Sequence, residues 1–392
     1  MPLPYRLSAS CRLLQSFLLR SCYLVYVLFV VTTTAAGGQT SQSAANAKVR
    51  LAIVGLNHDH VWGILKDIAG EKGAELIAIA ESDSALVSRA KGRVPASVKF
   101  FDDFVKMLDD VKPDAVIATT ANDRHLEILR ECARRHIHFS TEKPMATNAA
   151  DAREMLRLAD SAGLKLLVNY WNAWVPPTRA MMEHVRSGDV GSVQKIIVEY
   201  GHSGPKEIGV SQQFAAWLYD PQKNGGGAIM DFGCYGAEWA IWLKGMPTRV
   251  FATAKKMKVA QNNRVDDDAT IILDYPDGAA ILQASWDWPY GMDRVEVFGP
   301  NGSLLATGEE LLFRGAKDRR QEAGLDGKPL KLEPLPPEAS NPVAYFVDCI
   351  QHDRPIKDPV SAELNVQVLE VLDAARQSLQ SGRAEEIKRS SK

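Results

Sequence analysis

The sequence predicts an α/β domain with a doubly wound parallel sheet, followed by an α+β domain with an open antiparallel sheet. Two observations predict this order. From residue 49 to 170, near-continuous apolar strands alternate with segments of helical spacing, which is typical of a parallel sheet covered on both faces. After residue 170, alternating strands are joined by hairpin signals, of which "YPDG" and "GPNG" are the clearest.

The elements of the first half follow from these patterns in chain order. Buried strands are expected where apolar runs of four to eight residues occur, and helices where apolar residues recur every three or four positions. The expected strands are 49–56, 75–82, 114–120, 137–144 and 164–170, and the expected helices are 60–70, 84–92, 102–110, 124–135 and 148–163.

In the second half of the chain, the sequence pattern predicts mostly strands and few helices. Strands are expected over 193–202, 249–259, 269–288 (with a turn) and 293–307, and a closing amphipathic helix over 361–382 ends at Gly382. The domains we expect are therefore 48–168 and 169–392.

Residues 1–47 have the layout of a secretory signal. Arg6, Arg12 and Arg20 precede the apolar run "CYLVYVLFVV", and small polar residues follow it. We expect export to the periplasm or the exterior. The alternatives are an uncleaved N-terminal anchor, which would be the only membrane contact, and a start codon assigned too far upstream.

Net charge argues against nucleic acid as a partner, and cysteine spacing argues against disulfide and cysteine–metal sites. The formal charge is −2, and without the three leader arginines 43 basic residues face 48 acidic ones with no basic run, so nucleic acid is not expected as a partner. Beyond the leader, the three cysteines Cys132, Cys234 and Cys349 are widely spaced, which indicates neither a disulfide framework nor a metal knuckle.

The stretch "VGLNHDHVWG" (54–63) lies where a G-x-G-x-x-G turn is expected. Gly55 supplies the first glycine, Asn57 stands at the second position and tolerates a left-handed backbone, and His60 stands at the third. His60 therefore either moves the following helix outward or points toward the ligand. A nucleotide fold that has lost its nucleotide is the alternative.

Acidic and histidine side chains near this turn bear on its ligand. Glu81 ends the second strand, where a carboxylate holds ribose hydroxyls and repels a 2′-phosphate, so NAD is favoured over NADP. His58 and His60 flank Asp59, but adjacent and alternating residues on a tight turn rarely converge on one ion, so no metal is expected.

Two further stretches suit acid–base chemistry. Lys143, in "STEKPMATN" (140–148), follows a strand of the parallel sheet, where ligands bind. Asp231 and Tyr235, in "GGGAIMDFGCYGAEW" (225–239), are four residues apart and are expected on one helix face, where the tyrosine can pass a proton. A surface lysine and a helix-surface hydrogen bond are the alternatives.

Taken in order, these segments resemble the glucose-fructose oxidoreductase / inositol dehydrogenase (Gfo/Idh/MocA) family over nearly the whole chain after the leader. The matching segments are "TTANDRH" (119–125), "EKP" (142–144), "GDVGSV" (188–193), "GGGAIMDFG" (225–233) and "AARQSLQSG" (374–382).

The resemblance implies a NAD-binding Rossmann domain and a substrate domain whose open sheet mediates homo-oligomerisation. It implies Lys143, Asp231 and Tyr235 as catalytic residues, with Tyr235 where many members have histidine. Because tyrosine titrates near pH 10, Lys143 or the cofactor would need to lower its pKa. The implied cofactor residues are Gly55, Leu56, Asn57, His58, Glu81, Thr120, Asn122, His125, Glu142 and Lys143.

Substrate contacts are expected after the strand 164–170. The family often has basic residues there, whereas this chain reads "NYWNAWVPP". We expect Asn169, Trp171, Trp174 and His202 to face the substrate, with the tryptophans stacking on a sugar ring. Hinge packing is the alternative for both tryptophans. Trp286 and Trp288 share one strand face and are expected to pack in the sheet or an interface.

These features favour a nicotinamide-dependent oxidoreductase that acts on a sugar, polyol or sugar derivative by hydride transfer. Because free NAD is scarce outside the cytoplasm, an exported enzyme is expected to hold its cofactor tightly. A redox-neutral, NAD-dependent glycoside-cleaving enzyme is therefore the second hypothesis. A non-catalytic sugar-binding relic is the third, supported by the incomplete glycine turn.

Overall fold

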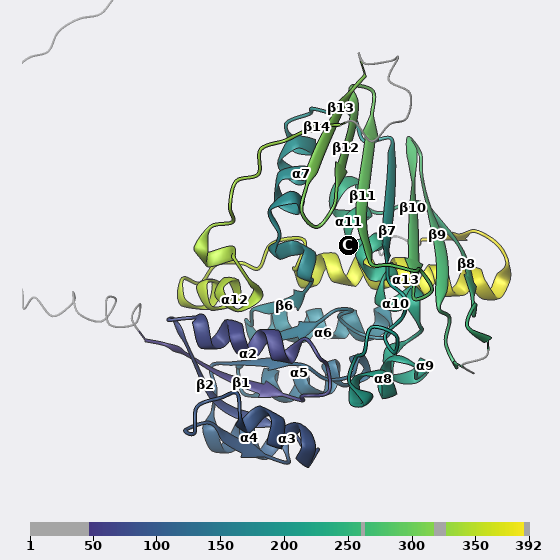
Figure 1. The fold of residues 1–392 in the computed structure, drawn as a ribbon. Coiled ribbons are helices and arrows are strands. Elements are labelled where there is room, and N and C mark those ends of the chain that lie inside the picture. The colour runs from purple at the N-terminus through teal and green to yellow at the C-terminus, as the bar shows by residue number, and fades with distance from the viewer. Residues whose placement is uncertain (1–46, 260–262, 317–326, 388–392) are drawn as a thin grey trace, which may run out of the picture. The chain divides into compact units, whose positions relative to one another are not determined.

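The computed structural model describes residues 47–259, 263–316 and 327–387. The predicted leader, except for its last residue, lies outside this part of the chain. No helix within the described ranges is long and apolar enough to cross a membrane. The described residues form one compact unit, in which a parallel sheet and a larger mixed sheet lie one above the other (Figure 1).

The first sheet confirms the doubly wound architecture. Its six strands run parallel in the order β3-β2-β1-β4-β5-β6, and the order reverses between β1 and β4, where α/β sheets bind ligands. The strands are β1 (Val49–Val54), β2 (Ala74–Ala80), β3 (Lys99–Phe101), β4 (Ala115–Ala118), β5 (His138–Glu142) and β6 (Leu166–Asn169).

Helices cover both faces of this sheet. Asp83, Asp103 and Asn148 cap three of them by accepting hydrogen bonds from backbone amides of the first turn, which explains where these helices begin. The helices are α2 (Val61–Gly70), α3 (Ser84–Lys91), α4 (Phe104–Val111), α5 (His125–Arg134), α6 (Ala149–Ala162) and α12 (Pro342–Gln351), with 3₁₀ turns η1 (Asn122–Arg124) and η4 (Pro337–Ala339).

The second sheet has nine strands in the order β14-β13-β12-β11-β7-β10-β9-β8-β15. It is mostly antiparallel, as predicted, and β7 and β10 form its one parallel pair among the described strands. The chain leaves β7, passes several helices and the β8–β9 pair, and returns beside β7 in the same direction. The strands are β7 (Lys195–Gly201), β8 (Arg249–Lys255), β9 (Asp268–Tyr275), β10 (Gly278–Ser285), β11 (Met292–Gly299), β12 (Gly302–Ala306), β13 (Leu311–Gly315), β14 (Lys328–Pro329) and β15 (Glu385–Glu386).

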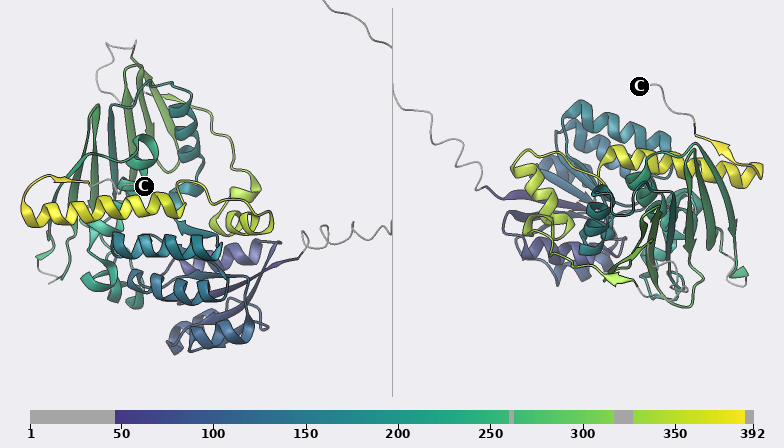
Figure 2. Two further views of the ribbon diagram at one scale, coloured as in Figure 1. Left: turned by 180° about the vertical axis from the view of Figure 1, so that it is seen from behind. Right: turned by 90° about the horizontal axis from the view of Figure 1, so that it is seen from above.

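One face of the second sheet packs on helices, and the other is open (Figure 2). The long helix α13 (Ala362–Ser381) packs on β8, α6 and α11 (Gly233–Lys244), and so joins the two sheets. The remaining helical elements are η2 (Trp171–Trp174), α7 (Pro176–Arg186), α8 (Gln212–Leu218), α9 (Pro221–Asn224) and α10 (Ala228–Asp231). The helix expected to carry both Asp231 and Tyr235 is interrupted at Phe232, so that Asp231 ends α10 and Tyr235 lies in α11, although both are close to Lys143.

Candidate active site

The turn after β1 is built on Gly55. Its φ is +83°, and a Cβ there would lie 2.3 Å from Thr120 Cγ2 and 3.0 Å from the Thr119 oxygen. Only glycine combines this backbone conformation with so close an approach. Asn57, by contrast, has a negative φ, so the left-handed conformation expected for it is wrong. Its carbonyl accepts a hydrogen bond from Trp217 Nε1 at 3.0 Å.

Several buried polar atoms beside this turn have no partner among the described residues. They are Asn57 Oδ1, Asn122 Oδ1 and His125 Nε2. The other side-chain nitrogens of Asn122 and His125 are used: Asn122 Nδ2 donates to Asn224 Oδ1 at 2.7 Å, and His125 Nδ1 lies 3.1 Å from the Met145 oxygen. An unsatisfied buried polar atom costs roughly 1–3 kcal/mol. The set therefore fits a polar ligand such as a dinucleotide.

The acid at the end of β2 holds the turn in place. Glu81 accepts hydrogen bonds from the backbone amides of Leu56 (2.7 Å) and Asp83 (2.8 Å). Asp83 caps α3 and accepts a further bond from Gln213 Nε2 at 3.2 Å. The carboxylates of Glu81 and Asp83 thus lie at or just after the end of β2, where the sequence predicts contacts with ribose hydroxyls of a dinucleotide.

The burial of His125 makes stability depend on pH. Burial lowers its pKa to about 4, against smaller opposing effects from hydrogen bonds and Glu142. An unfolded histidine titrates near 6.5, so the unfolded chain binds the extra proton first. We expect unfolding free energy to fall as pH drops from 6.5 to 4, by about 3 kcal/mol from this residue. Urea unfolding across this window tests the expectation. If the unfolding free energy of the His125→Gln variant falls equally steeply between pH 6.5 and 4, the expectation is contradicted.

Lys143 and Asp231 form a buried ion pair between the two sheets. Lys143 follows β5 and Asp231 ends α10; Lys143 Nζ lies 2.5 Å from Asp231 Oδ1 and 3.2 Å from the Asp231 carbonyl oxygen. The side chains are 6% and 12% exposed. Although burial opposes both charges, each partner stabilises the other, so the pKa of Lys143 is raised and that of Asp231 is lowered.

The glycine run 225–227 leads into this short helix, whose last residue is Asp231. A Cβ on Gly227 would lie 1.7 Å from the backbone oxygen of Asp266. The Asp266 carboxylate accepts bonds from the amides of Gly227 (2.8 Å) and Ile229 (2.7 Å). The third glycine therefore allows the chain to approach Asp266, which fixes the helix that carries Asp231.

Trp286 belongs to this site, which corrects the expectation that it only packs in the sheet. Its Nε1 donates to Asp231 Oδ2 at 2.9 Å, and the residue is buried. We expect Trp286→Phe to lower kcat about tenfold with little change in KM, since a hydrogen bond to a charged group contributes about 1.5–3 kcal/mol.

Steady-state kinetics of this variant and of Trp288→Phe test the assignment. Trp288 lies two residues away, and its ring packs near Gly201 rather than bonding Asp231. Equal losses in both variants would contradict a positioning role for Trp286.

Tyr235 lies in a stack of aromatic rings. Its ring is parallel to that of Tyr200 at 4.8 Å and meets that of Tyr170 edge-on at 5.2 Å. Lys143 Nζ lies 5.0 Å from the centroid of the Tyr235 ring. Burial, with the nearby acidic groups, raises the pKa of Tyr235 well above 10. Of the two groups that could lower this pKa, Lys143 does not do so in this structure, although it lies close to the ring.

Glu142, next to Lys143, points to the nucleotide turn instead. Its Oε2 lies 2.9 Å from His60 Nδ1, and its Oε1 accepts a bond from Asn169 Nδ2 at 2.7 Å. His60 is the N-cap residue of α2, and its imidazole turns toward Glu142. His58 is close to both, so the histidines of the turn do converge with a third ligating group, contrary to the expectation.

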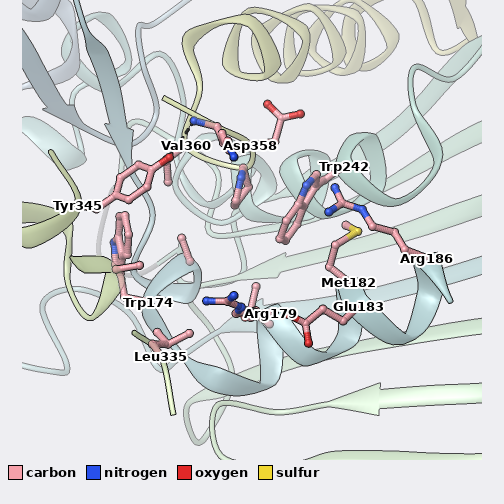
Figure 3. Close-up of a pocket in the computed structure, with 15 residues that line it drawn as sticks. Trp174, Arg179, Met182, Glu183, Arg186, Trp242, Leu335, Tyr345, Asp358 and Val360 are labelled. Carbon is pink, nitrogen blue, oxygen red and sulfur yellow. Dashed lines mark hydrogen bonds and ion pairs between the residues drawn. The ribbon is translucent and has the colours of Figure 1, made fainter. Parts of the chain in front are cut away.

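The expected substrate residues fall into two places. Asn169 Oδ1 accepts a bond from Trp174 Nε1 at 2.8 Å, and Trp174 lines a cavity of about 300 Å³ with Arg179, Arg186 and Trp242 (Figure 3). The residues lining this cavity do not include Lys143, Asp231 or Tyr235.

Trp171 and His202 lie nearer the ion pair. Trp171 is 38% exposed, and its ring centroid lies 6.5 Å from that of Tyr200. His202 meets Phe232 edge-on at 5.0 Å, and Lys143 Nζ lies 5.9 Å from the Phe232 ring. These two residues are therefore placed with the aromatic stack and the ion pair.

The helix α8 covers the nucleotide turn, and no sequence pattern indicated this. Besides Trp217, the Phe214 ring lies 4.3 Å from that of His58, and the Ser211 amide donates to Asp59 Oδ2 at 2.6 Å. The turn is thus held between the first domain and a helix from the second half of the chain.

Comparisons with known proteins cover both halves. Residues 49–170 match a family model described as an oxidoreductase family with a NAD-binding Rossmann fold, and residues 178–305 match a GFO/IDH/MocA C-terminal domain. The chain is 26% identical over 345 residues to D-apiose dehydrogenase of Paraburkholderia graminis, covering 85% of this chain and 86% of that protein.

Two further proteins are similar. A scyllo-inositol 2-dehydrogenase (NADP(+)) of Bacillus subtilis is 24% identical over 292 residues, covering 70% of this chain and 78% of that one. The crystal structure of an aldose-aldose oxidoreductase from Caulobacter crescentus, complexed with glycerol, has a TM-score of 0.73 at 22% identity and covers 86% and 99% of the two chains. This last similarity concerns the fold.

Proposed function

The chain belongs to the GFO/IDH/MocA oxidoreductase family, and from that premise we propose that it transfers hydride between a nicotinamide cofactor and a CH–OH group of a sugar, polyol or sugar derivative. The curated relatives include dehydrogenases of D-apiose and of inositol. The observation that carries the proposal for this chain is that two adjacent residues at the end of β5 contact different parts of the site. Glu142 contacts the nucleotide turn, and Lys143 contacts Asp231.

The buried ion pair suits proton transfer to or from a substrate oxygen. Lys143 holds its proton in the resting protein, because Asp231 raises its pKa against the effect of burial. The resting protein is therefore prepared to protonate a carbonyl oxygen, and alcohol oxidation requires Lys143 to lose its proton first. Asp231, held by Trp286, positions the ammonium. Tyr235, whose pKa is raised by burial, keeps its phenol proton and is therefore less suited than Lys143 to act as the base.

We propose that the cofactor is NAD, held by Gly55, the unpartnered atoms of Asn57, Asn122 and His125, and the acids at the end of β2. When bound, it supplies the hydride acceptor for the carbinol carbon. The Bacillus subtilis relative is named for NADP(+), so the preference for NAD rests on this chain's own residues. Glu81 and Asp83 would both repel a 2′-phosphate.

One experiment tests the proposed function. Nucleotide released by heat from the purified protein is identified by mass spectrometry, and the protein is then assayed for NADH with a panel of aldoses, polyols and glycosides. Oxidation with NAD, faster at higher pH, supports the proposal. Cleavage of a glycoside without net NADH would select the redox-neutral alternative, and no nucleotide affinity with no turnover would select the non-catalytic one.

We also propose that the open sheet face mediates self-association, as the resemblance implies. Phe251, Ile272, Ile281 and Ile197 form one row across β8, β9, β10 and β7, and Ile272 is 39% exposed. A row of apolar side chains on an uncovered face is typical of an interface. Ile272→Glu is expected to shift light-scattering mass from oligomer to monomer. The exposed Ile208, outside the sheets, provides the control. An unchanged mass in Ile272→Glu, or the same shift in Ile208→Glu, would contradict the proposal.

A further inference from the structure

Three metal-ligating side chains converge beside the nucleotide turn. His58 and His60 come from the turn itself, and Glu142 ends β5, 82 residues after His60. One ligating atom from each lies within 4.8 Å of the other two. Over residues 47–259, 263–316 and 327–387, no other three histidine, cysteine or acidic side chains meet this condition.

The surroundings of this cluster hold two of the three ligands in place. His58 and Glu142 are each only 1% exposed. The Phe214 ring packs on the imidazole of His58, and the His58 amide donates to the Thr119 oxygen at 3.2 Å. Asn169 holds one oxygen of Glu142 and is itself held by Trp174. Hydrogen bonds to the second oxygen of a ligating carboxylate are typical of metal sites, because they orient the first.

The third ligand leaves one side of the cluster open. The His60 side chain is 41% exposed, and its only polar side-chain contact among the described residues is with Glu142 Oε2. This hydrogen bond joins two groups that would both bind an ion placed between them. Solvent can therefore deliver a cation to the cluster and complete its coordination.

The charges around this cluster are mixed. The Lys143 ammonium acts electrostatically on both His58 and Glu142, but it is paired with Asp231 Oδ1 at 2.5 Å. The turn 55–60 contains Asp59 and no lysine or arginine. A cation would thus add positive charge to a segment that has none of its own.

We propose that His58, His60 and Glu142 form a binding site for a divalent transition-metal ion of the zinc type. Two imidazoles and one carboxylate with an open position are a typical zinc ligand set, and imidazole disfavours magnesium and calcium. The ion replaces the His60–Glu142 hydrogen bond with bonds from both groups. The inference does not depend on the proposed oxidoreductase activity, because it concerns the protein without nucleotide or substrate.

Metal titration of the full-length protein tests the site. The protein is treated with a chelator, dialysed and titrated with Zn²⁺ by calorimetry, and separately with Co²⁺ while visible absorption is recorded. We expect one ion per chain and the ligand-field bands of low-coordinate cobalt. His60→Asn and Glu142→Gln are each expected to weaken Zn²⁺ affinity at least about tenfold, as loss of a ligand or its orientation does elsewhere.

A second histidine provides a matched control. His184 Nδ1 lies 2.6 Å from Asp189 Oδ2, so it also pairs with a carboxylate but lacks a third ligand. His184→Asn should leave Zn²⁺ affinity unchanged. Absence of Zn²⁺ binding in the wild type, unchanged affinity in His60→Asn, or an equal loss in His184→Asn overturns the proposal. Because His60 is exposed, its variant decides the question even if Glu142→Gln fails to fold. All titrations omit nucleotide and sugar, so failure of the dehydrogenase assay leaves them unaffected.

Discussion

Lys143→Met is expected to lower kcat by about 10²–10⁴-fold while NAD still binds, because the variant removes the group that exchanges a proton with the substrate oxygen. The nucleotide contacts proposed above come from other residues, among them Gly55 and Asn57. The measurement is steady-state turnover with the best wild-type substrate, together with NAD affinity from fluorescence titration. It is made well below the melting temperature of each variant, since Lys143 is buried.

Lys143→Arg separates proton transfer from charge. Arginine retains the positive charge beside Asp231 but does not give up its proton near neutral pH. If Lys143 moves a proton, this variant stays inactive while its NAD affinity remains. If the side chain contributes only charge, Lys143→Arg recovers much of the turnover. Wild-type kcat in Lys143→Met would remove Lys143 from the mechanism altogether.

Asp231→Ala is expected to cost about 3–5 kcal/mol of unfolding free energy, the usual effect of leaving one member of a buried ion pair without its partner. The Lys143 side chain is 6% exposed, so water cannot replace the carboxylate. Trp286 Nε1 loses its acceptor at the same time. Urea unfolding at neutral pH measures the loss.

The double variant Lys143→Met/Asp231→Leu distinguishes stability from catalysis. Replacing both charges by apolar groups of similar size is often neutral or stabilising, so we expect it to be more stable than Asp231→Ala yet inactive. A loss below about 1 kcal/mol in Asp231→Ala would indicate that water or another group reaches Lys143. That result would contradict the buried ion pair.

The first half of the fold follows closely from the sequence because its strands are buried on both faces. Runs such as 49–54 are apolar at nearly every position, and the intervening helices have clear N-caps such as Asp83. Strand order at the switch point then places the ends of β1, β4 and β5 together. The meeting of Lys143 with Asp231 does not follow from strand order; it was implied by the family resemblance that "EKP" and "GGGAIMDFG" carry.

Other features depend on contacts that no local pattern specifies. Strand alternation indicates which face Trp286 occupies, but not that Asp231 lies opposite its indole. The pKa of Tyr235 depends on rings from β7 and the end of β6, and the cluster of His58, His60 and Glu142 depends on two loops that are distant in sequence. The parallel pairing of β7 with β10 is likewise a result of the chain's return path.

The contacts of α8 with the nucleotide turn have a kinetic consequence. Trp217, Phe214 and Ser211 bind the turn through an indole N–H, an aromatic ring and a backbone amide, so these contacts loosen together if α8 moves away. A dinucleotide seated beneath such a helix leaves no faster than the helix opens. The residence time of the proposed cofactor is then expected to depend on how often α8 opens.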